Sequence, residues 1–225
     1  MATVCIVGST GLTGSHIYTT LSCHPKFNTI YAYSRKDLPV SEKLKPLISQ
    51  DTSSWPSQYP TGAELFIAAL GTTRAAAGGF DNQRKIDYDL NLALARAAKE
   101  AGTKHYVLIS SSGANSSSML GYPKILQGEL EDAVKAIGFD HVIVLRPGLI
   151  VGPRKDSRFA EAVLRKTAMT AGSWSGNRLK DFWAQDADVI AKAAGVDCVE
   201  GRETERFRVL GQADIVRLGR TEWKD

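Results

Sequence analysis

The stretch VCIVGSTGLTG at residues 4–14 decides the fold of this chain. Its apolar, β-branched start predicts a buried strand, and the glycines that follow predict a tight turn into a helix. Glycines at such a junction let backbone amides approach a phosphate at the helix N-terminus. The spacing alone is weak evidence, but its place directly after a strand predicts a dinucleotide-binding loop. The expected contacts come from Gly8, Ser9, Thr10, Gly11, Leu12, Thr13 and Gly14.

Apolar, β-branched runs alternate with amphipathic stretches along the rest of the chain. Strands are expected at residues 3–7, 29–34, 44–50, 64–70, 105–110, 141–145 and 206–210. Helices are expected at residues 12–22, 80–101, 122–137, 157–171, 184–196 and 213–219. This alternation predicts an α/β protein with one doubly wound parallel sheet, the Rossmann fold. The length of 225 residues predicts a single domain over 1–225, with 153–200 as the segment on the substrate side.

The charges and cysteines narrow the classes of function. The 28 basic and 24 acidic residues are mixed along the chain, which argues against a nucleic-acid partner but permits an anionic cofactor or a membrane surface. Cys5, Cys23 and Cys198 are far apart, so neither a disulfide framework nor a metal site is expected, and a reducing compartment is favoured. No apolar run approaches the roughly 20 residues that span a bilayer, and the first strand leaves no room for a presequence. The sequence therefore predicts an intracellular protein that contacts membranes at most peripherally.

A basic pair follows the second expected strand. Arg35 and Lys36 stand about 20 residues after Gly14, where proteins that prefer NAD(H) usually carry an acidic residue against the ribose hydroxyls. A guanidinium can form two hydrogen bonds with a 2′-phosphate. We therefore predict NADP(H) as the cofactor, with a solvated surface pair as the alternative.

Two further segments are expected to line the cofactor. Asp51 can accept a hydrogen bond from the adenine amino group, although an acid in a loop is often only solvated. Leu70, Gly71 and Thr72 follow the fourth strand at the carboxyl edge of the sheet, where a cofactor crosses an open parallel sheet. Their backbone is therefore expected to pass close to the dinucleotide.

Hydroxyl groups follow the fifth expected strand. Ser111 and Ser112 lie in the serine run after this strand, and Tyr122 begins the next helix. A tyrosine can donate its proton to a developing alkoxide while a serine hydroxyl orients the carbonyl, and a nicotinamide supplies the hydride. This arrangement predicts reduction of a small carbonyl compound. The alternative is an ordinary serine loop followed by an ordinary helix start.

Several motifs together resemble a known family. They are GSTGLTG at 8–14, LGTTRAAAGG at 70–79, ISSSGA at 109–114, GELEDAVKAIGF at 128–139, LRPGLIVG at 145–152 and QADIVRLGRTEWKD at 212–225. The chain resembles the fungal found-in-mitochondrial-proteome family of atypical short-chain dehydrogenases, and more distantly the animal Tat-interacting oxidoreductase. The resemblance spans nearly the whole chain and is thin from 153 to 200.

This resemblance implies a Rossmann fold that binds NADP(H). It implies that Tyr122 takes the position of the family's proton donor and that Pro147 and Gly148 lie beside the nicotinamide. It also implies peripheral association with the mitochondrial outer membrane, an address that composition and spacing do not show. A cytoplasmic protein would have the same sequence features.

One departure from the family pattern bears on activity. The family carries a lysine four residues after the tyrosine, whereas this chain has Leu126 there, and Lys124 is expected to point about 200° away from Tyr122 around the helix. Lys124 is therefore not expected to substitute for the missing lysine, and a lysine returned to position 126 is expected to speed turnover. Two functions stay open: an NADPH-dependent carbonyl reductase, or an NADP(H)-binding regulatory or sensing protein with little turnover.

Overall fold

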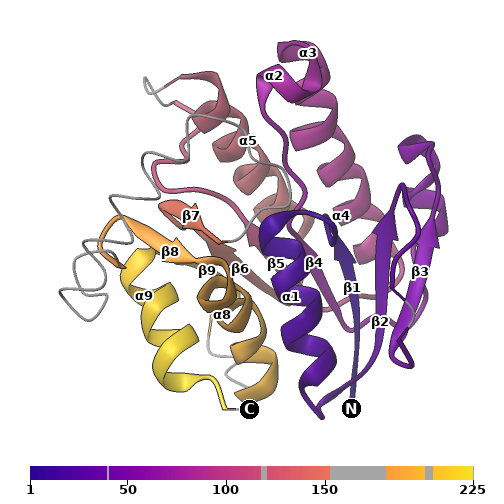
Figure 1. The fold of residues 1–225 in the computed structure, drawn as a ribbon. Helices are drawn as coiled ribbons and strands as arrows, with labels where there is room; N and C mark the ends of the chain where they lie inside the picture. Colours follow the sequence, from indigo (N-terminus) through magenta and orange to yellow (C-terminus); the bar gives the residue numbers. More distant parts are fainter. Residues whose placement is uncertain (40, 118–120, 153–180, 201–204, 225) are drawn as a thin grey trace.

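A parallel sheet of seven strands lies at the centre of the molecule, in the order β3-β2-β1-β4-β5-β6-β9 (Figure 1). The computed structural model describes the chain except residues 40, 118–120, 153–180, 201–204 and 225 and the side chains of 197–200. The strands of this sheet are β1 (Ala2–Val7), β2 (Phe27–Ser34), β3 (Leu44–Ile48), β4 (Leu65–Ala68), β5 (His105–Ile109), β6 (His141–Leu145) and β9 (Phe207–Leu210). All neighbouring strands run parallel. The predicted doubly wound α/β architecture is confirmed.

Helices cover both faces of the sheet. They are α1 (Leu12–Cys23), α2 (Arg74–Ala77), α3 (Phe80–Arg84), the π-helical η3 (Lys85–Leu90), α4 (Asn91–Glu100), α5 (Tyr122–Ile137), α8 (Ala187–Glu200), α9 (Gln212–Arg217) and the π-helical η4 (Leu218–Glu222), with short 3-10 turns η1 (Thr52–Ser54) and η2 (Pro56–Gln58). Figure 1 shows α1, α8 and α9 on the near face and α4 and α5 on the far face. Each face therefore has its own layer of helices.

The alternation of side chains along β1 supplies the core on both faces. Val4 and Ile6 pack with the cluster under α1 and α8, whereas Cys5 and Val7 pack with the cluster under α4 and α5. All four side chains are fully buried. A strand covered on both faces must be apolar at every position, which is why this run reads as continuous rather than alternating.

The order in which successive strands are added to the sheet reverses between β1 and β4. The connections from β1 through β2 to β3 build one half of the sheet, and β4, β5 and β6 build the other half. In an open parallel sheet, the loops after the strands on either side of such a switch point leave a crevice at the carboxyl edge. The glycine loop after β1 and the loop after β4 both open at this place.

Some predicted elements differ in detail from the structure. The helix predicted at 80–101 is α3, η3 and α4 in succession, and the turn α2 before it was not predicted. The helix predicted at 184–196 is wrong in its first three residues, because β8 (Ala184–Asp186) pairs in parallel with β7 (Leu149–Val151) in a second small sheet. The helix predicted at 157–171 lies outside the described residues.

The π-helical stretch η3 has a local cause in the side chain of Asn91. Its Nδ2 donates to the carbonyl oxygens of Ile86 and Asp87, both at 3.1 Å. A widened helical turn frees backbone carbonyls from the regular ladder, and this amide provides them with partners. The sequence pattern of apolar residues does not report such a change of hydrogen bonding.

The glycines of the loop after β1 are required by close backbone contact. A Cβ built on Gly14 would lie 2.0 Å from the carbonyl oxygen of Gly8, and one on Gly8 would lie 2.4 Å from the carbonyl oxygen of Ala69. Gly8 also has a φ of +84°, a left-handed conformation that side chains disfavour. The end of β1, the start of α1 and the end of β4 therefore meet without intervening side chains.

Substituting Gly14 by alanine is expected to lower the free energy of unfolding by about 1 to 3 kcal/mol or more, because the added methyl forces the first turn of α1 away from the loop. Urea denaturation followed by circular dichroism measures this loss. Gly71→Ala is the matched control, since a Cβ there meets nothing within 4 Å. Equal stability of the two variants would contradict the close packing of the loop.

Candidate functional site

The glycine loop leads into the N-terminus of α1, whose first turn carries no acidic side chain. Gly11 caps the helix without a side-chain hydrogen bond. The hydroxyl of Ser9 is buried and donates to the carbonyl of Tyr33 at 3.1 Å, which ties the loop to the end of β2. The helix N-terminus thus presents backbone amides and the positive end of its dipole. Gly8 and Gly14 allow the close backbone contacts that shape this loop, since a Cβ at either position would clash with neighbouring backbone.

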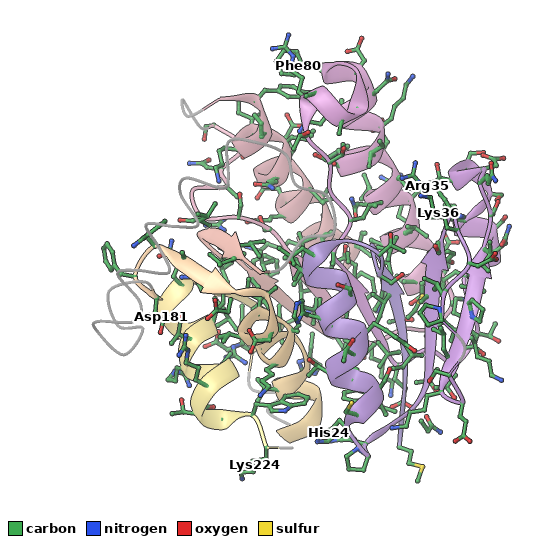
Figure 2. The ribbon with its side chains drawn as sticks, in the orientation of Figure 1. His24, Arg35, Lys36, Phe80, Asp181 and Lys224 are labelled. Atoms are coloured by element: carbon green, nitrogen blue, oxygen red, sulfur yellow. The ribbon has the colours of Figure 1, made fainter. Side chains whose placement is uncertain are left out.

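The basic pair lies exposed directly after β2, as Figure 2 shows for Arg35 and Lys36. The turn is held by Ser34, whose hydroxyl accepts from the backbone amide of Lys36 at 3.0 Å and donates to its carbonyl at 2.6 Å. The pair follows Tyr33, the residue to which the glycine loop is bonded. The two cationic side chains are therefore anchored beside the loop with their charged ends in solvent.

Asp51 has a structural partner of its own. Its carboxylate caps η1 and accepts from the backbone amide of Ser53 at 3.0 Å and from the Ser53 hydroxyl at 2.6 Å. These hydrogen bonds lower the pKa of the exposed Asp51 carboxyl. The predicted contact with adenine stays a prediction, because capping alone accounts for an acid here.

Side chains from α3, η3 and α4 form hydrogen bonds with the backbone of the loop after β4. Asp87 accepts from the backbone amide of Thr72 at 2.7 Å, and Gln83 donates to the Thr72 carbonyl at 3.3 Å. Asn91, which is fully buried, donates to the Leu70 carbonyl at 3.3 Å. Desolvation raises the pKa of Asp87. Together these three side chains fix the backbone of the predicted cofactor loop.

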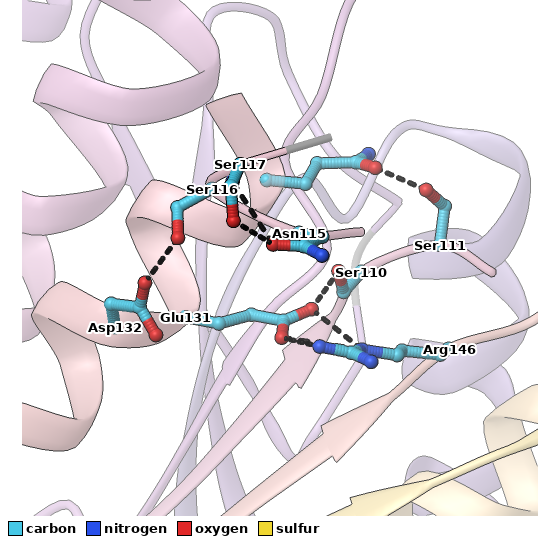
Figure 3. Close-up of polar contacts among 9 residues, drawn as sticks. Ser110, Ser111, Asn115, Ser116, Ser117, Glu131, Asp132 and Arg146 are labelled. Carbon is cyan, nitrogen blue, oxygen red and sulfur yellow. Dashed lines mark hydrogen bonds and ion pairs between the residues drawn. The ribbon is translucent and has the colours of Figure 1, made fainter. Parts of the chain in front are cut away.

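Lys124, rather than Tyr122, contacts Ser111 and Ser112. The Lys124 ammonium donates to the Ser111 hydroxyl at 2.7 Å and to the Ser112 carbonyl, and desolvation lowers the pKa of Lys124. The Ser111 hydroxyl in turn donates to the side-chain oxygen of Gln127 (Figure 3). The Lys124 side chain thus reaches Ser111 from the first turn of α5.

Tyr122 packs against α3 instead. Its ring meets the ring of Phe80 edge-on, with centroids 4.9 Å apart and an interplanar angle of 65°. The pKa of the Arg84 guanidinium is raised, mainly by its hydrogen bond to Glu129 and next by its hydrogen bond to Tyr122. The predicted convergence of Tyr122 with Ser111 and Ser112 is therefore not among the contacts that the structure shows.

The position of α5 explains why Lys124 contacts Ser111 while Tyr122 packs on Phe80. A Cβ on Gly128 would lie 2.2 Å from the carbonyl carbon of Asn115 and 2.1 Å from the amide of Ser116, so the helix rests directly on the serine loop at this point. Lys124 lies one turn before Gly128 on the same face, and Gln127 is three residues after Lys124 and so neighbours it on the helix surface. Leu126 is 1% exposed, so a lysine there would have to bury its ammonium, and we now expect it to destabilise the fold rather than to speed turnover.

A buried ion pair lies beneath the serine loop. The Glu131 side chain is 4% exposed and that of Arg146 32% exposed, and their bidentate contact includes Arg146 Nε to Glu131 Oε1 at 3.1 Å (Figure 3). The hydroxyl of Ser110 donates to the same carboxylate at 2.5 Å. This network joins β5, α5 and β6. The sequence analysis did not single it out, although GELED and LRPG are the motifs that carry it.

The loop after β6 meets the serine loop at the edge of the sheet. The amide of Ser112 donates to the Pro147 carbonyl at 2.7 Å, and the amide of Gly148 donates to the buried side chain of Gln185 at 2.6 Å. A Cβ on Gly148 would lie 2.3 Å from the carbonyl oxygen of Trp183. The predicted positions Pro147 and Gly148 therefore lie beside Ser112, where the resemblance expects a nicotinamide.

The described residues also bear on metal binding and on membrane-spanning helices. In that part of the chain no group of three or more histidine, cysteine, aspartate or glutamate side chains has an arrangement that could hold a metal ion. None of the helices described is both long enough and apolar enough to cross a membrane.

Fold and site together define a class of protein. A parallel sheet in this order, with a glycine loop directly after β1, is a Rossmann fold. A UDP-N-acetylglucosamine 4-epimerase from Methanobrevibacter ruminantium has the same fold, with a TM-score of 0.69 at 18% identity over 93% of this chain and 76% of that one. So does WbmH of Bordetella bronchiseptica, solved in complex with NAD+, with a TM-score of 0.67 at 15% identity over 94% and 75%.

Relatives in sequence identify the family. Protein fmp52, mitochondrial, of Aspergillus clavatus is 50% identical over 235 residues, covering 97% of this chain and 99% of that protein. The corresponding protein of Neurospora crassa is 41% identical over 233 residues, covering 98% and 96%. The HIM1 family model matches residues 45–172, more than half of the chain. The chain belongs to the fmp52 family, which confirms the resemblance drawn from its motifs.

Substituting Arg146 by methionine is expected to lower the free energy of unfolding by about 3 to 5 kcal/mol, because the Glu131 carboxylate stays buried without its cation. Replacing both partners, as in Arg146→Met with Glu131→Leu, should recover most of that loss. Asp140→Asn serves as the control in urea denaturation: it breaks a pair with Lys99 whose side chains are 51% and 35% exposed, and should cost less than about 1 kcal/mol. A loss in Arg146→Met no larger than the control's would contradict a structural role for the buried pair.

Proposed function

We propose that this protein binds NADP(H) and reduces a small carbonyl compound. The observation that carries the proposal is the glycine loop, bonded through Ser9 to the end of β2 and so placed beside Arg35 and Lys36. The pyrophosphate would lie on this loop, and the 2′-phosphate would lie between the two cations. Charge-assisted contacts to a 2′-phosphate favour NADP(H) over NAD(H).

The remaining contacts follow the carboxyl edge of the sheet. Asp51 would lie near the adenine, the backbone of 70–72 would lie along the middle of the cofactor, and Pro147 and Gly148 would lie beside the nicotinamide. When bound, the dinucleotide supplies the hydride. Ser111 and Ser112 would orient the carbonyl oxygen, and we assign residues 153–200 to the substrate side of a single domain.

A second candidate function rests on the position of Tyr122. In the structure its ring packs on Phe80, and the family lysine position holds the buried Leu126. A protein that has lost the tyrosine and lysine arrangement but kept the cofactor loop would bind NADP(H) with little turnover, and could regulate a partner through the bound state. The two candidates differ in turnover and agree in binding.

The cellular site of action is proposed from the relatives, whose names place them in mitochondria. We propose a mitochondrial location with peripheral attachment to the outer membrane. Carbonate extraction of purified mitochondria should release the protein, and protease added to intact mitochondria should digest it. Protection from the protease would place it inside the organelle instead.

Substituting Arg35 by alanine is expected to weaken NADPH binding about 10- to 100-fold and NADH binding by less than about threefold, because only NADPH carries the 2′-phosphate. Fluorescence titration of the reduced cofactors measures both constants. Lys104→Ala removes an exposed cation at the opposite edge of the sheet and should change neither. Equal losses for NADPH and NADH in Arg35→Ala would contradict the cofactor assignment.

The wild-type protein is expected to oxidise NADPH when offered reactive carbonyl compounds such as diacetyl or an ortho-quinone. A panel of aldehydes, ketones and quinones, followed by loss of NADPH absorbance, tests this directly. Tight NADPH binding with no oxidation across the panel would contradict the reductase and support the regulatory protein. Absence of NADPH binding would overturn both.

A further inference from the structure

Lys124 brings a cationic amine to the serine loop without a carboxylate beside it. Its ammonium donates to the Ser111 hydroxyl at 2.7 Å and to the Ser112 carbonyl. Across the residues that the structure describes, no carboxylate lies within ion-pair distance of this amine. In the part of the chain that the structure describes, the acceptors of this cation are therefore two neutral oxygens.

The acidic side chains on the same helix have other partners. Glu131 is bonded to Ser110 and Arg146, and Glu129 is paired with Arg84. Asp132 accepts from the hydroxyl of Ser116 at 2.8 Å. An ammonium in a structural ion pair is held charged, whereas one that is half-buried beside a hydroxyl can give up its proton more readily.

The geometry of Ser111 completes a path for a proton. Its hydroxyl oxygen accepts from Lys124 and its hydrogen points to the side-chain oxygen of Gln127. Ser111 directly follows Ser110 after the end of β5, at the edge of the sheet where β4 and β6 also end. A carbonyl oxygen that takes the place of Gln127 as acceptor would meet a hydroxyl already bonded to an ammonium.

Resting on the proposed carbonyl reduction, we propose that Lys124 supplies the proton for that reaction through Ser111, in place of the tyrosine that packs on Phe80. The carbonyl carbon takes up one hydride, which is a proton together with two electrons, from NADPH. The carbonyl oxygen takes the Ser111 hydroxyl proton, and Ser111 takes a proton from the Lys124 ammonium. The products are an alcohol, NADP+ and a neutral Lys124 amine, which water reprotonates at its solvent-accessible side.

Four variants separate this role from a structural one. Lys124→Met should lower kcat with diacetyl and NADPH at least about tenfold while the NADPH dissociation constant stays within about twofold. Lys124→Arg keeps the cation but does not release its proton near neutral pH, so it should be as slow as Lys124→Met. Tyr122→Phe and the same-helix control Lys135→Met should keep kcat within about twofold of wild type.

The pH profile gives a second test of the same variants. Reduction needs the ammonium form, so wild-type kcat should fall as pH rises through the pKa of Lys124, which is lowered from the ordinary lysine value of about 10.4. Lys124→Arg should lack this fall. Because proton transfer runs through one pair of residues, Ser111→Ala combined with Lys124→Met should be no slower than the slower single variant.

A measurement without cofactor tests the amine itself. Competitive labelling of the native protein with trace acetic anhydride, read by peptide mass spectrometry across pH, gives the midpoint at which each lysine becomes reactive. The Lys124 midpoint should lie below the ordinary lysine value of about 10.4. A Lys124 midpoint at or above that value would overturn the inference.

The outcomes also separate the inference from the function on which it rests. A wild-type protein that binds NADPH but reduces no carbonyl overturns the reductase and this inference with it. An active wild type that loses activity in Tyr122→Phe and keeps it in Lys124→Met overturns the inference alone. Full rescue by Lys124→Arg reduces Lys124 to a positioning residue for Ser111 and likewise overturns it.

Discussion

The backbone contact between Gly8 and Gly14 is the constraint on which the site depends. Since a single methyl on Gly14 would lie 2.0 Å from the Gly8 carbonyl oxygen, the first turn of α1 can sit on the loop only when position 14 lacks a side chain. Gly8 makes a similar approach to Ala69 after β4. The loop is then fastened to β2 through Ser9. One packed junction thereby brings together a helix N-terminus, a basic pair and the loop after β4.

A second close contact sets the other end of the site. Gly128 lets α5 rest on the backbone of Asn115 and Ser116, and the ion pair of Glu131 with Arg146 holds the same helix to β6. With the helix fixed at this rotation, Lys124 and Gln127 are the side chains that reach Ser111. Position along the helix, rather than residue type alone, thus decides which group serves the serine loop.

The sequence was sufficient for the fold and for the position of the glycine loop between β1 and α1. Apolar continuity in β1 and glycine spacing after it depend on local steric rules, so they could be recognised without coordinates. The reactive end was less predictable, because it depends on the rotation of α5, which Gly128 and the buried pair determine from positions distant in sequence. Asp87 and Asn91 were missed for a related reason: their role follows from the π-helical turn, which the periodicity of apolar residues does not report.

A crystal structure of the protein soaked with NADP+ tests the central claim most directly. The account predicts the pyrophosphate on the backbone of 8–14, the 2′-phosphate within hydrogen-bond distance of Arg35, and the nicotinamide at the edge formed by Ser111 and Gly148. A dinucleotide bound in another place, or one whose 2′-phosphate points away from Arg35 and Lys36, would contradict it.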